Sequence, residues 1–240
     1  MLKQLMAMGL SLCVCTAALA QETPPTPNPS QYVNTGGLYI KGGLNLANVS
    51  TSSDGSVNSA HTRASFNAGL VGDIPLANFL SLQVGAEFTG KGSKAQYNSS
   101  LYTGTYTFRP YYVEIPVNAV FKVPLGPGAA LLLGAGVYGA MGVAGDYITN
   151  VNSGVGSSTS TQSIKWTDQS DVTTGSENGS GAGVLRRYDF GMNYLAGFEL
   201  GPVQLTANYG MGLTKISSTA DNNNDNDKNR VFSINVGFRL

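Results

Sequence analysis

Apolar and polar residues alternate with a period of two in eight separate stretches, and this alternation limits the fold more than any other feature of the sequence. In the last stretch Phe232, Ile234 and Val236 alternate with Ser233 and Asn235. A period of two predicts β-strands with one apolar and one polar face. The chain is therefore expected to be all-β, with strands near 38–46, 66–74, 80–91, 111–122, 131–142, 188–199, 203–212 and 232–240.

The length of these stretches and the segments between them predict a membrane barrel. Each stretch has about ten residues, which is the length that a tilted strand needs to cross a bilayer. Tight turns at 75–78, 124–127 and 201–202 alternate with long polar segments near 47–63, 95–109, 145–186 and 217–229. We therefore predict an eight-stranded antiparallel up-and-down transmembrane β-barrel over 37–240, with periplasmic turns and long extracellular loops.

The orientation of the two faces needs further evidence, because a soluble periplasmic binding barrel also shows alternation. Glycines and charged residues lie on the polar face, as expected for a narrow lumen, while aromatic residues lie near strand ends on the apolar face, as in interfacial girdles. The apolar face is therefore expected to face lipid, and the soluble barrel stays an alternative. The expected lumen charge network is Lys41, Asp73, Glu87, Lys91, Glu114, Lys122, Asp189, Glu199 and Arg239.

The lumen of an eight-stranded barrel is just wide enough for side chains to fill it. We expect the lumen charges to pair with one another and to plug the interior. A narrow small-solute channel or transport component is the alternative, and it requires a continuous water path past these charges.

The N-terminal residues predict export. Lys3 precedes an apolar run over 5–19, and Ala18-Leu19-Ala20 is typical of a cleavage site, so residues 1–20 are interpreted as a signal peptide. Both cysteines, Cys13 and Cys15, would leave with this segment, so no disulfide or thiolate site is expected. The Pro-rich residues 21–36 are interpreted as a periplasmic tail outside the fold. Together with the barrel, this segment predicts a protein of the outer membrane.

Several function classes are disfavoured. The 14 basic and 14 acidic residues balance, which leaves no electrostatic footprint for nucleic acid. His61 is the single histidine, and no G-x-S-x-G or H-E-x-x-H motif is present, so an enzyme is not expected. Asp221, Asn223 and Asp225 alternate like calcium ligands, but the glycine and the glutamate of an EF-hand loop are missing. We expect no metal site and no cofactor, and leave a weak calcium site open.

The segment 145–186 is too long to be a simple connection, and it holds Trp166, the only tryptophan. A polar loop around one large aromatic residue suits contact with an extracellular or envelope protein or with a glycan. We therefore predict a structural or surface-interaction role, with Trp166 as a contact residue and membrane lipid around the barrel.

Six short motifs resemble the PorT-like outer-membrane β-barrel domain family. In order, they are GGLNLANVS (42–50), GKGSK (90–94), YVEIPV (112–117), GPGAALLLGAGVYG (126–139), GPVQLTANYGMGLTKI (201–216) and KNRVFSINVGFRL (228–240). The resemblance implies an eight-stranded outer-membrane barrel with both termini in the periplasm. Pro116 lies within one of these motifs, and because proline cannot donate a ladder hydrogen bond, we expect a bulge or a missing rung there.

Overall fold

Eight antiparallel strands form a closed ring in the computed structural model, which describes residues 32–50, 60–98, 102–153, 156–167, 184–216 and 228–240. Each of the eight predicted stretches lies in one strand of the ring, apart from the end residues Lys91 and Leu240, which fall just beyond their strands. No helix in these ranges is long and apolar enough to span a membrane. The ring strands are β1 (Gly37–Ser50), β3 (Arg63–Ala77), β4 (Leu80–Gly90), β6 (Tyr102–Gly126), β7 (Ala129–Ser153), β11 (Tyr188–Leu200), β12 (Val203–Gly212) and β13 (Lys228–Arg239).

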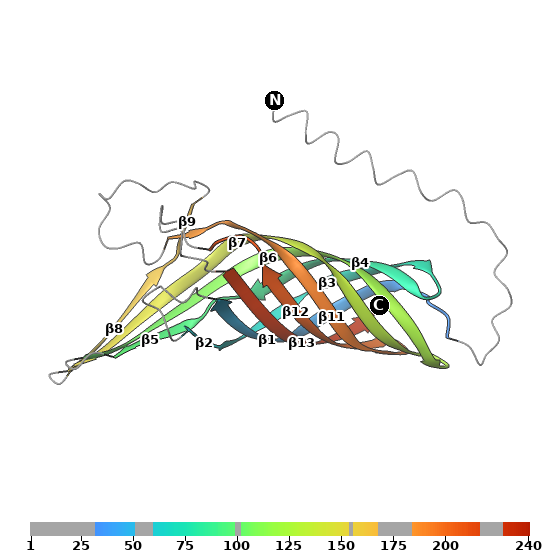
Figure 1. The fold of residues 1–240 in the computed structure, drawn as a ribbon, viewed down its shortest axis with the longest axis horizontal. Helices are drawn as coiled ribbons and strands as arrows, with labels where there is room; N and C mark the ends of the chain where they lie inside the picture. The colour runs from blue at the N-terminus through green and yellow to red at the C-terminus, as the bar shows by residue number, and fades with distance from the viewer. Residues whose placement is uncertain (1–31, 51–59, 99–101, 154–155, 168–183, 217–227) are drawn as a thin grey trace, which may run out of the picture.

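The first and last strands close the ring. β1 pairs with β13 from Tyr39 opposite Arg239 to Ser50 opposite Lys228, and every other ring strand pairs with its neighbours in the chain. Short turns join β3 to β4, β6 to β7 and β11 to β12 at the end of the barrel where the C-terminus lies (Figure 1). The predicted up-and-down barrel is confirmed, and closure leaves no exposed sheet edge within the membrane.

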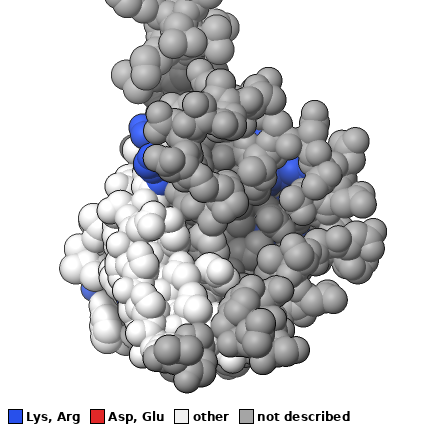
Figure 2. All heavy atoms as spheres, turned by 90° about the vertical axis from the view of Figure 1, so that its left-hand side faces the viewer, with Lys and Arg blue, Asp and Glu red and all other residues white. Residues whose placement is uncertain are grey.

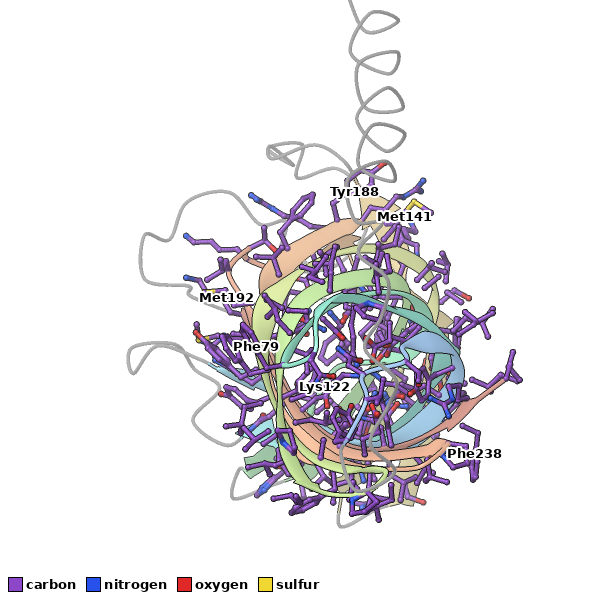
Figure 3. The ribbon with its side chains drawn as sticks, turned by 90° about the vertical axis from the view of Figure 1, so that its right-hand side faces the viewer. Phe79, Lys122, Met141, Tyr188, Met192 and Phe238 are labelled. Atoms are coloured by element: carbon purple, nitrogen blue, oxygen red, sulfur yellow. The ribbon has the colours of Figure 1, made fainter. Side chains whose placement is uncertain are left out.

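The distribution of side chains is the reverse of that in a soluble protein. Leu44 is 72% exposed and Ile234 is 56% exposed, whereas Asn235 beside it is fully buried. Figure 3 looks along the barrel axis and shows Phe79 and Phe238 outside the ring and Lys122 inside it. A continuous apolar outer surface of this kind requires lipid rather than water around it, so the prediction that the apolar face points outward is confirmed.

Aromatic rings form two groups on the outer surface. Near the extracellular end, Phe88 stacks on Tyr111 with ring centroids 5.4 Å apart, and near the turns Phe79 stacks on Phe121 at 6.0 Å. Tyr111 and Phe121 are ten residues apart on β6, about 33 Å along a strand. At a tilt of about 40° this separation corresponds to about 25 Å along the axis, which is the height of the apolar band of an outer-membrane barrel.

Over their described residues, two of the predicted extracellular loops are largely strand, which corrects the sequence-based expectation. Between the short turns and the level of Gly90 and Met141, β6 pairs with β4, and β7 pairs with β11. Beyond that level, β6 pairs with β5 (Lys94–Asn98), and β7 pairs with β8 (Gly156–Ser163). β6 and β7 remain paired with each other as far as Tyr102 opposite Ser153. We call this four-stranded continuation of β5, β6, β7 and β8 the extracellular sheet; it projects from one end of the barrel (Figure 1).

Three further short strands lie at the extracellular end. β2 (Ala60–His61) pairs with β5, and β9 (Lys165–Thr167) pairs in parallel with β10 (Val184–Arg186).

Pro116 interrupts the ladder as predicted. The pairing of β4 with β6 runs from Leu80 to Val84 and resumes at Glu87, and the two pairs that would include Ile115 and Pro116 are missing. The register is the same on both sides of the gap, so the irregularity is a missing rung rather than a bulge. A Cβ atom on Gly85 would lie 3.0 Å from Cγ of Pro116, so glycine gives the proline ring the room it needs.

Candidate functional site

The lumen charges lie in three groups along the barrel axis. The periplasmic lysine cluster is Lys122, Asp73 and Glu199, next to the short turns. Nζ of Lys122 lies 2.7 Å from Asp73 and 2.9 Å from Glu199, and the side chains of the lysine and of Asp73 are fully buried. Gln204 also donates to both carboxylates, at 3.3 Å and 2.9 Å. One lysine thus neutralises one of two buried negative charges, and neutral donors satisfy further oxygen lone pairs.

The residues just before β1 fold into the periplasmic mouth. The hydroxyl of Tyr32 donates to Glu199 at 2.7 Å, and the Asn34 side chain accepts from Lys122 at 2.9 Å and donates to Ser81 at 2.9 Å. Burial, followed by the hydrogen bond to Glu199, raises the pKa of the Tyr32 hydroxyl, which keeps it a donor. The end of the predicted tail therefore belongs to the barrel, because its polar side chains satisfy the lumen cluster.

Gly36 makes this entry possible. Its φ of 57° lies in the left-handed region, and a Cβ atom there would overlap the carbonyl oxygen of Asp73 and the ring of Pro75.

The middle group is the pair of Lys41 and Glu87, whose charged atoms lie 2.7 Å apart. It separates two small cavities of about 20 Å³ and 40 Å³. Gln83 and Gln204 of the periplasmic end line the first cavity, and Glu114 of the extracellular end lines the second. Volumes of this size hold only a few water molecules each.

The extracellular lysine cluster is Lys91, Glu114 and Asp189. Nζ of Lys91 lies 2.8 Å from Glu114 and 3.0 Å from Asp189. The same atom lies 4.1 Å from the ring centroid of Tyr138 and 5.1 Å from that of Tyr112. Two carboxylates and two aromatic faces therefore hold one buried cation, and this packing fills the barrel below its extracellular mouth.

Trp166 lies above this cluster and points inward. Its ring meets Tyr112 edge-on, with centroids 5.4 Å apart and planes at 77°, and it is only partly exposed. Gly142 lies against the indole, because a Cβ atom there would overlap the ring. The described geometry thus gives Trp166 a packing contact at the mouth, and the predicted surface-contact role stays a prediction.

The remaining candidate residues lie apart from the three groups. Arg239 donates to Thr35 at the periplasmic rim and makes no contact with the lumen carboxylates within the described ranges. His61 is exposed in β2, opposite Lys94. Asp221, Asn223 and Asp225 lie outside the described residues, and among the residues that are described no group of acidic, histidine or cysteine side chains could hold a metal.

The extracellular sheet is the part of the site that the sequence reading missed. Arg109 of β6 pairs with Asp146 of β7, and this hydrogen bond raises the pKa of the arginine. On the other face, Phe108 stacks on Tyr147 with centroids 6.0 Å apart. Apolar and polar residues also alternate from Tyr106 to Arg109, but the apolar residues there lie on the opposite face of the strand from the apolar residues of 111–121, so a search for one continuous apolar face stops at Tyr111.

The solved structures to which this chain is similar share little sequence identity with it. The attachment invasion locus protein Ail of Yersinia pestis is 16% identical, with a TM-score of 0.36 over 85% of this chain and 99% of that chain. Neisserial surface protein A is 17% identical, with a TM-score of 0.40 over 85% and 97%. The translocator domain of the autotransporter NalP from Neisseria meningitidis is 11% identical, with a TM-score of 0.29 over 85% and 89%.

The comparison with curated protein sequences gives no match. The comparison with protein families gives one that spans residues 20–239, and its description is outer membrane protein beta-barrel domain. This range includes all eight ring strands. The chain is therefore an outer-membrane protein, and it belongs to the outer membrane protein beta-barrel domain family.

Proposed function

We propose that this protein is a surface-interaction protein, in which a closed barrel anchors the extracellular sheet above the membrane as a contact surface for an envelope or extracellular partner. The extracellular sheet is the observation that carries the proposal. From Tyr111 to Tyr102, β6 continues for nine residues beyond the outer aromatic group, about 30 Å along the strand. A barrel that served only as a membrane plug would not need a paired sheet of this length.

The extracellular sheet is well suited to contact because it is rigidly attached. β6 and β7 run without a break from the membrane wall into the sheet, and their pairing shifts register by one residue near Tyr111. β5 and β8 then satisfy the outer edges of β6 and β7. A surface on paired strands loses less conformational entropy on binding than an unpaired loop does.

The lumen supports an anchoring role rather than a transport role. Each lumen lysine contacts at least one carboxylate, and the two cavities hold only a few water molecules each. In a planar lipid bilayer, we expect no stepwise conductance from the purified protein. Reproducible ohmic steps would contradict the closed lumen and would favour the narrow channel.

Three finer assignments are part of the same proposal. We assign the chain to the PorT-like branch of its family on the six motifs named above. Residues 1–20 act as a cleaved export signal, and the Pro-rich residues after them form a short periplasmic tail. The role is structural and interactive rather than catalytic, and His61 is an exposed residue of a β-strand with no described nucleophile hydrogen-bonded to it.

Surface exposure is tested by cysteine labelling of intact cells. Since both cysteines lie in residues 1–20, the mature chain gives no background. Ser160→Cys in the extracellular sheet should react with a membrane-impermeant maleimide on intact cells. Leu125→Cys, at the turn between β6 and β7, should react only after the outer membrane is permeabilised. The reverse pattern would overturn the orientation.

The contact role is tested by shortening the extracellular sheet. Arg109 pairs with Asp146, and Asp146 pairs with Ser163, so residues 93–108 and residues 147–162 can each be replaced by an Asn-Gly turn at matched height. Cells that display the full chain should adhere to protein-coated or glycan-coated surfaces, and cells with the shortened chain should not. Equal adherence, with equal amounts of folded protein, would contradict the proposal.

A further inference from the structure

The two faces of the extracellular sheet differ in chemistry. Register places Phe108, Tyr147 and Gln162 in one row across β6, β7 and β8, and Tyr106, Thr149 and Ser160 in the next row on the same face. We call this the aromatic face. The opposite face presents the Arg109–Asp146 pair and a hydrogen bond of 2.7 Å from Thr159 to Asn150.

The aromatic face combines ring surfaces with neutral hydrogen-bonding groups. Tyr106 is 37% exposed, and Ser160 and Gln162 beside it are also exposed. The hydroxyl of Tyr147 donates to the side chain of Gln162, which fixes the rim of the stacked pair with Phe108. Neighbouring positions on this face are about 4.8 Å apart across strands and about 6.6 Å apart along a strand, so Tyr106 lies one row from the stacked pair and the three rings form one aromatic platform.

The platform carries no charge. Among the described residues, every charged side chain of the extracellular sheet above the barrel mouth lies on the opposite face or on β5, where Lys94 is exposed. Figure 2 looks onto the extracellular end, and most of its described surface is uncharged. Nucleic acid requires cations for its phosphates, and a sulfated or carboxylated glycan has the same requirement. Neither class of ligand fits an uncharged face.

We propose that the aromatic face binds a neutral oligosaccharide. The apolar faces of sugar rings stack on aromatic rings, and their hydroxyl groups exchange hydrogen bonds with hydroxyl and amide groups at the rim. Phe108 and Tyr147 supply one stacking surface, Tyr106 supplies a second, and Ser160 and Gln162 supply neutral donors and acceptors. This inference rests on the proposed function, because it names the class of partner that the extracellular sheet contacts.

The position of the rings on strands supports this assignment over a peptide partner. A peptide that added to the exposed edge of β8 would bind through backbone groups and would not need the rings of β6 and β7. Rings held at adjacent ladder positions are already ordered before a ligand arrives, so little side-chain entropy is lost when a sugar stacks on them.

The test uses the full mature chain in a zwitterionic detergent without a sugar head group. The probe is a set of immobilised neutral oligosaccharides of four to six sugars, with sulfated oligosaccharides of the same length beside them. We expect at least one neutral oligosaccharide to bind and its affinity to fall about tenfold or more in Tyr106→Ala and in Tyr147→Ala, as for the loss of one stacking ring.

Two further variants separate stacking from structure. Tyr147→Phe keeps the ring and should lose less affinity than Tyr147→Ala, because the change removes only the hydroxyl group and its hydrogen bond to Gln162. Thr105 lies next to Tyr106 on β6 but on the opposite face of the sheet, so Thr105→Ala should leave binding unchanged. Each variant is first shown to be folded by faster migration of the unboiled sample on a denaturing gel.

Three results would overturn the inference. The first is that no neutral oligosaccharide binds, and the second is that only sulfated oligosaccharides bind. The third is that binding is the same in Tyr106→Ala and Tyr147→Ala as in the unchanged protein. The last result would point to pairing at the β8 edge. If adherence of cells still requires the extracellular sheet while oligosaccharide binding fails, the proposed function stands and the carbohydrate assignment falls.

Discussion

The periplasmic lysine cluster makes a sharp prediction about stability. In Lys122→Met, a side chain of similar length fills the same space, but the charge between Asp73 and Glu199 is lost. Both carboxylates are at most 3% exposed, so water cannot replace the lysine without a change of structure. The side-chain oxygen of Asn34 also loses the hydrogen bond that it accepts from Lys122.

The expected loss follows from the burial of these groups. Removing one partner of a buried ion pair costs about 3–5 kcal/mol, because the remaining charge is left without compensation. Here two carboxylates lose their only cation within the described ranges, and the net charge of the cluster changes from −1 to −2. We expect the free energy of unfolding to fall by about 3–5 kcal/mol. This loss corresponds to about two to three and a half powers of ten in the folding equilibrium.

Lys41→Met is the matched control. This lysine has one carboxylate partner, its side chain is 16% exposed, and the pair borders both cavities. Water can solvate the remaining Glu87, so we expect a loss of at most about 2 kcal/mol. The two variants remove the same group from the same lumen, and only the burial and the number of partners differ.

The assay is reversible urea unfolding in lipid vesicles. Unfolding is monitored by Trp166 fluorescence and by the difference in gel migration between boiled and unboiled samples. Adding Asp73→Asn and Glu199→Gln to Lys122→Met should recover most of the loss, because the uncompensated charges are removed. A loss below about 1 kcal/mol in Lys122→Met, or one equal to that of Lys41→Met, would refute the claim that burial sets the size of the effect.

Further predictions test other contacts. Gly142→Ala should displace the ring of Trp166 and shift its fluorescence emission to the red, while Gly139→Ala on the same strand should leave the spectrum unchanged. Tyr32→Phe removes the hydroxyl that donates to a buried carboxylate, and urea titration should show a loss of about 1.5–3 kcal/mol. Pro116→Ala allows the missing rung to form, so the same titration should show a change of less than about 1 kcal/mol, in contrast to the large effect of most core substitutions.

The barrel could be predicted in detail because the membrane imposes a simple rule on each strand. A strand between lipid and a polar lumen must alternate at every position, so the faces and the approximate bounds of the membrane-spanning part of all eight strands follow from the sequence. Pro116 could be located for the same reason, since its missing donor must affect a known ladder. These features depend only on neighbours along the chain and on the solvent on each side.

The partners inside the lumen could not be predicted, because they depend on the register and shear of the closed ring. Lys122 contacts Asp73 and Glu199, which are 49 and 77 residues away in sequence. Alternation identifies these side chains as inward-facing but gives no height along the axis. Tyr32 was missed for a different reason, since the Pro-rich composition before it hides a short segment whose side chains complete the cluster.

The extracellular sheet could not be recognised from composition, since Ser, Thr, Gly and Asn are typical of loops. β8 is Ser- and Thr-rich and fully exposed, and a strand of this composition has little apolar area to bury. It becomes ordered because β7 is already fixed by the barrel and offers a complete row of backbone donors and acceptors. The conformational entropy of the contact surface is thus lost when the barrel folds rather than when a ligand binds. It follows that variants that weaken barrel closure should weaken ligand binding even when every residue of the aromatic face is intact.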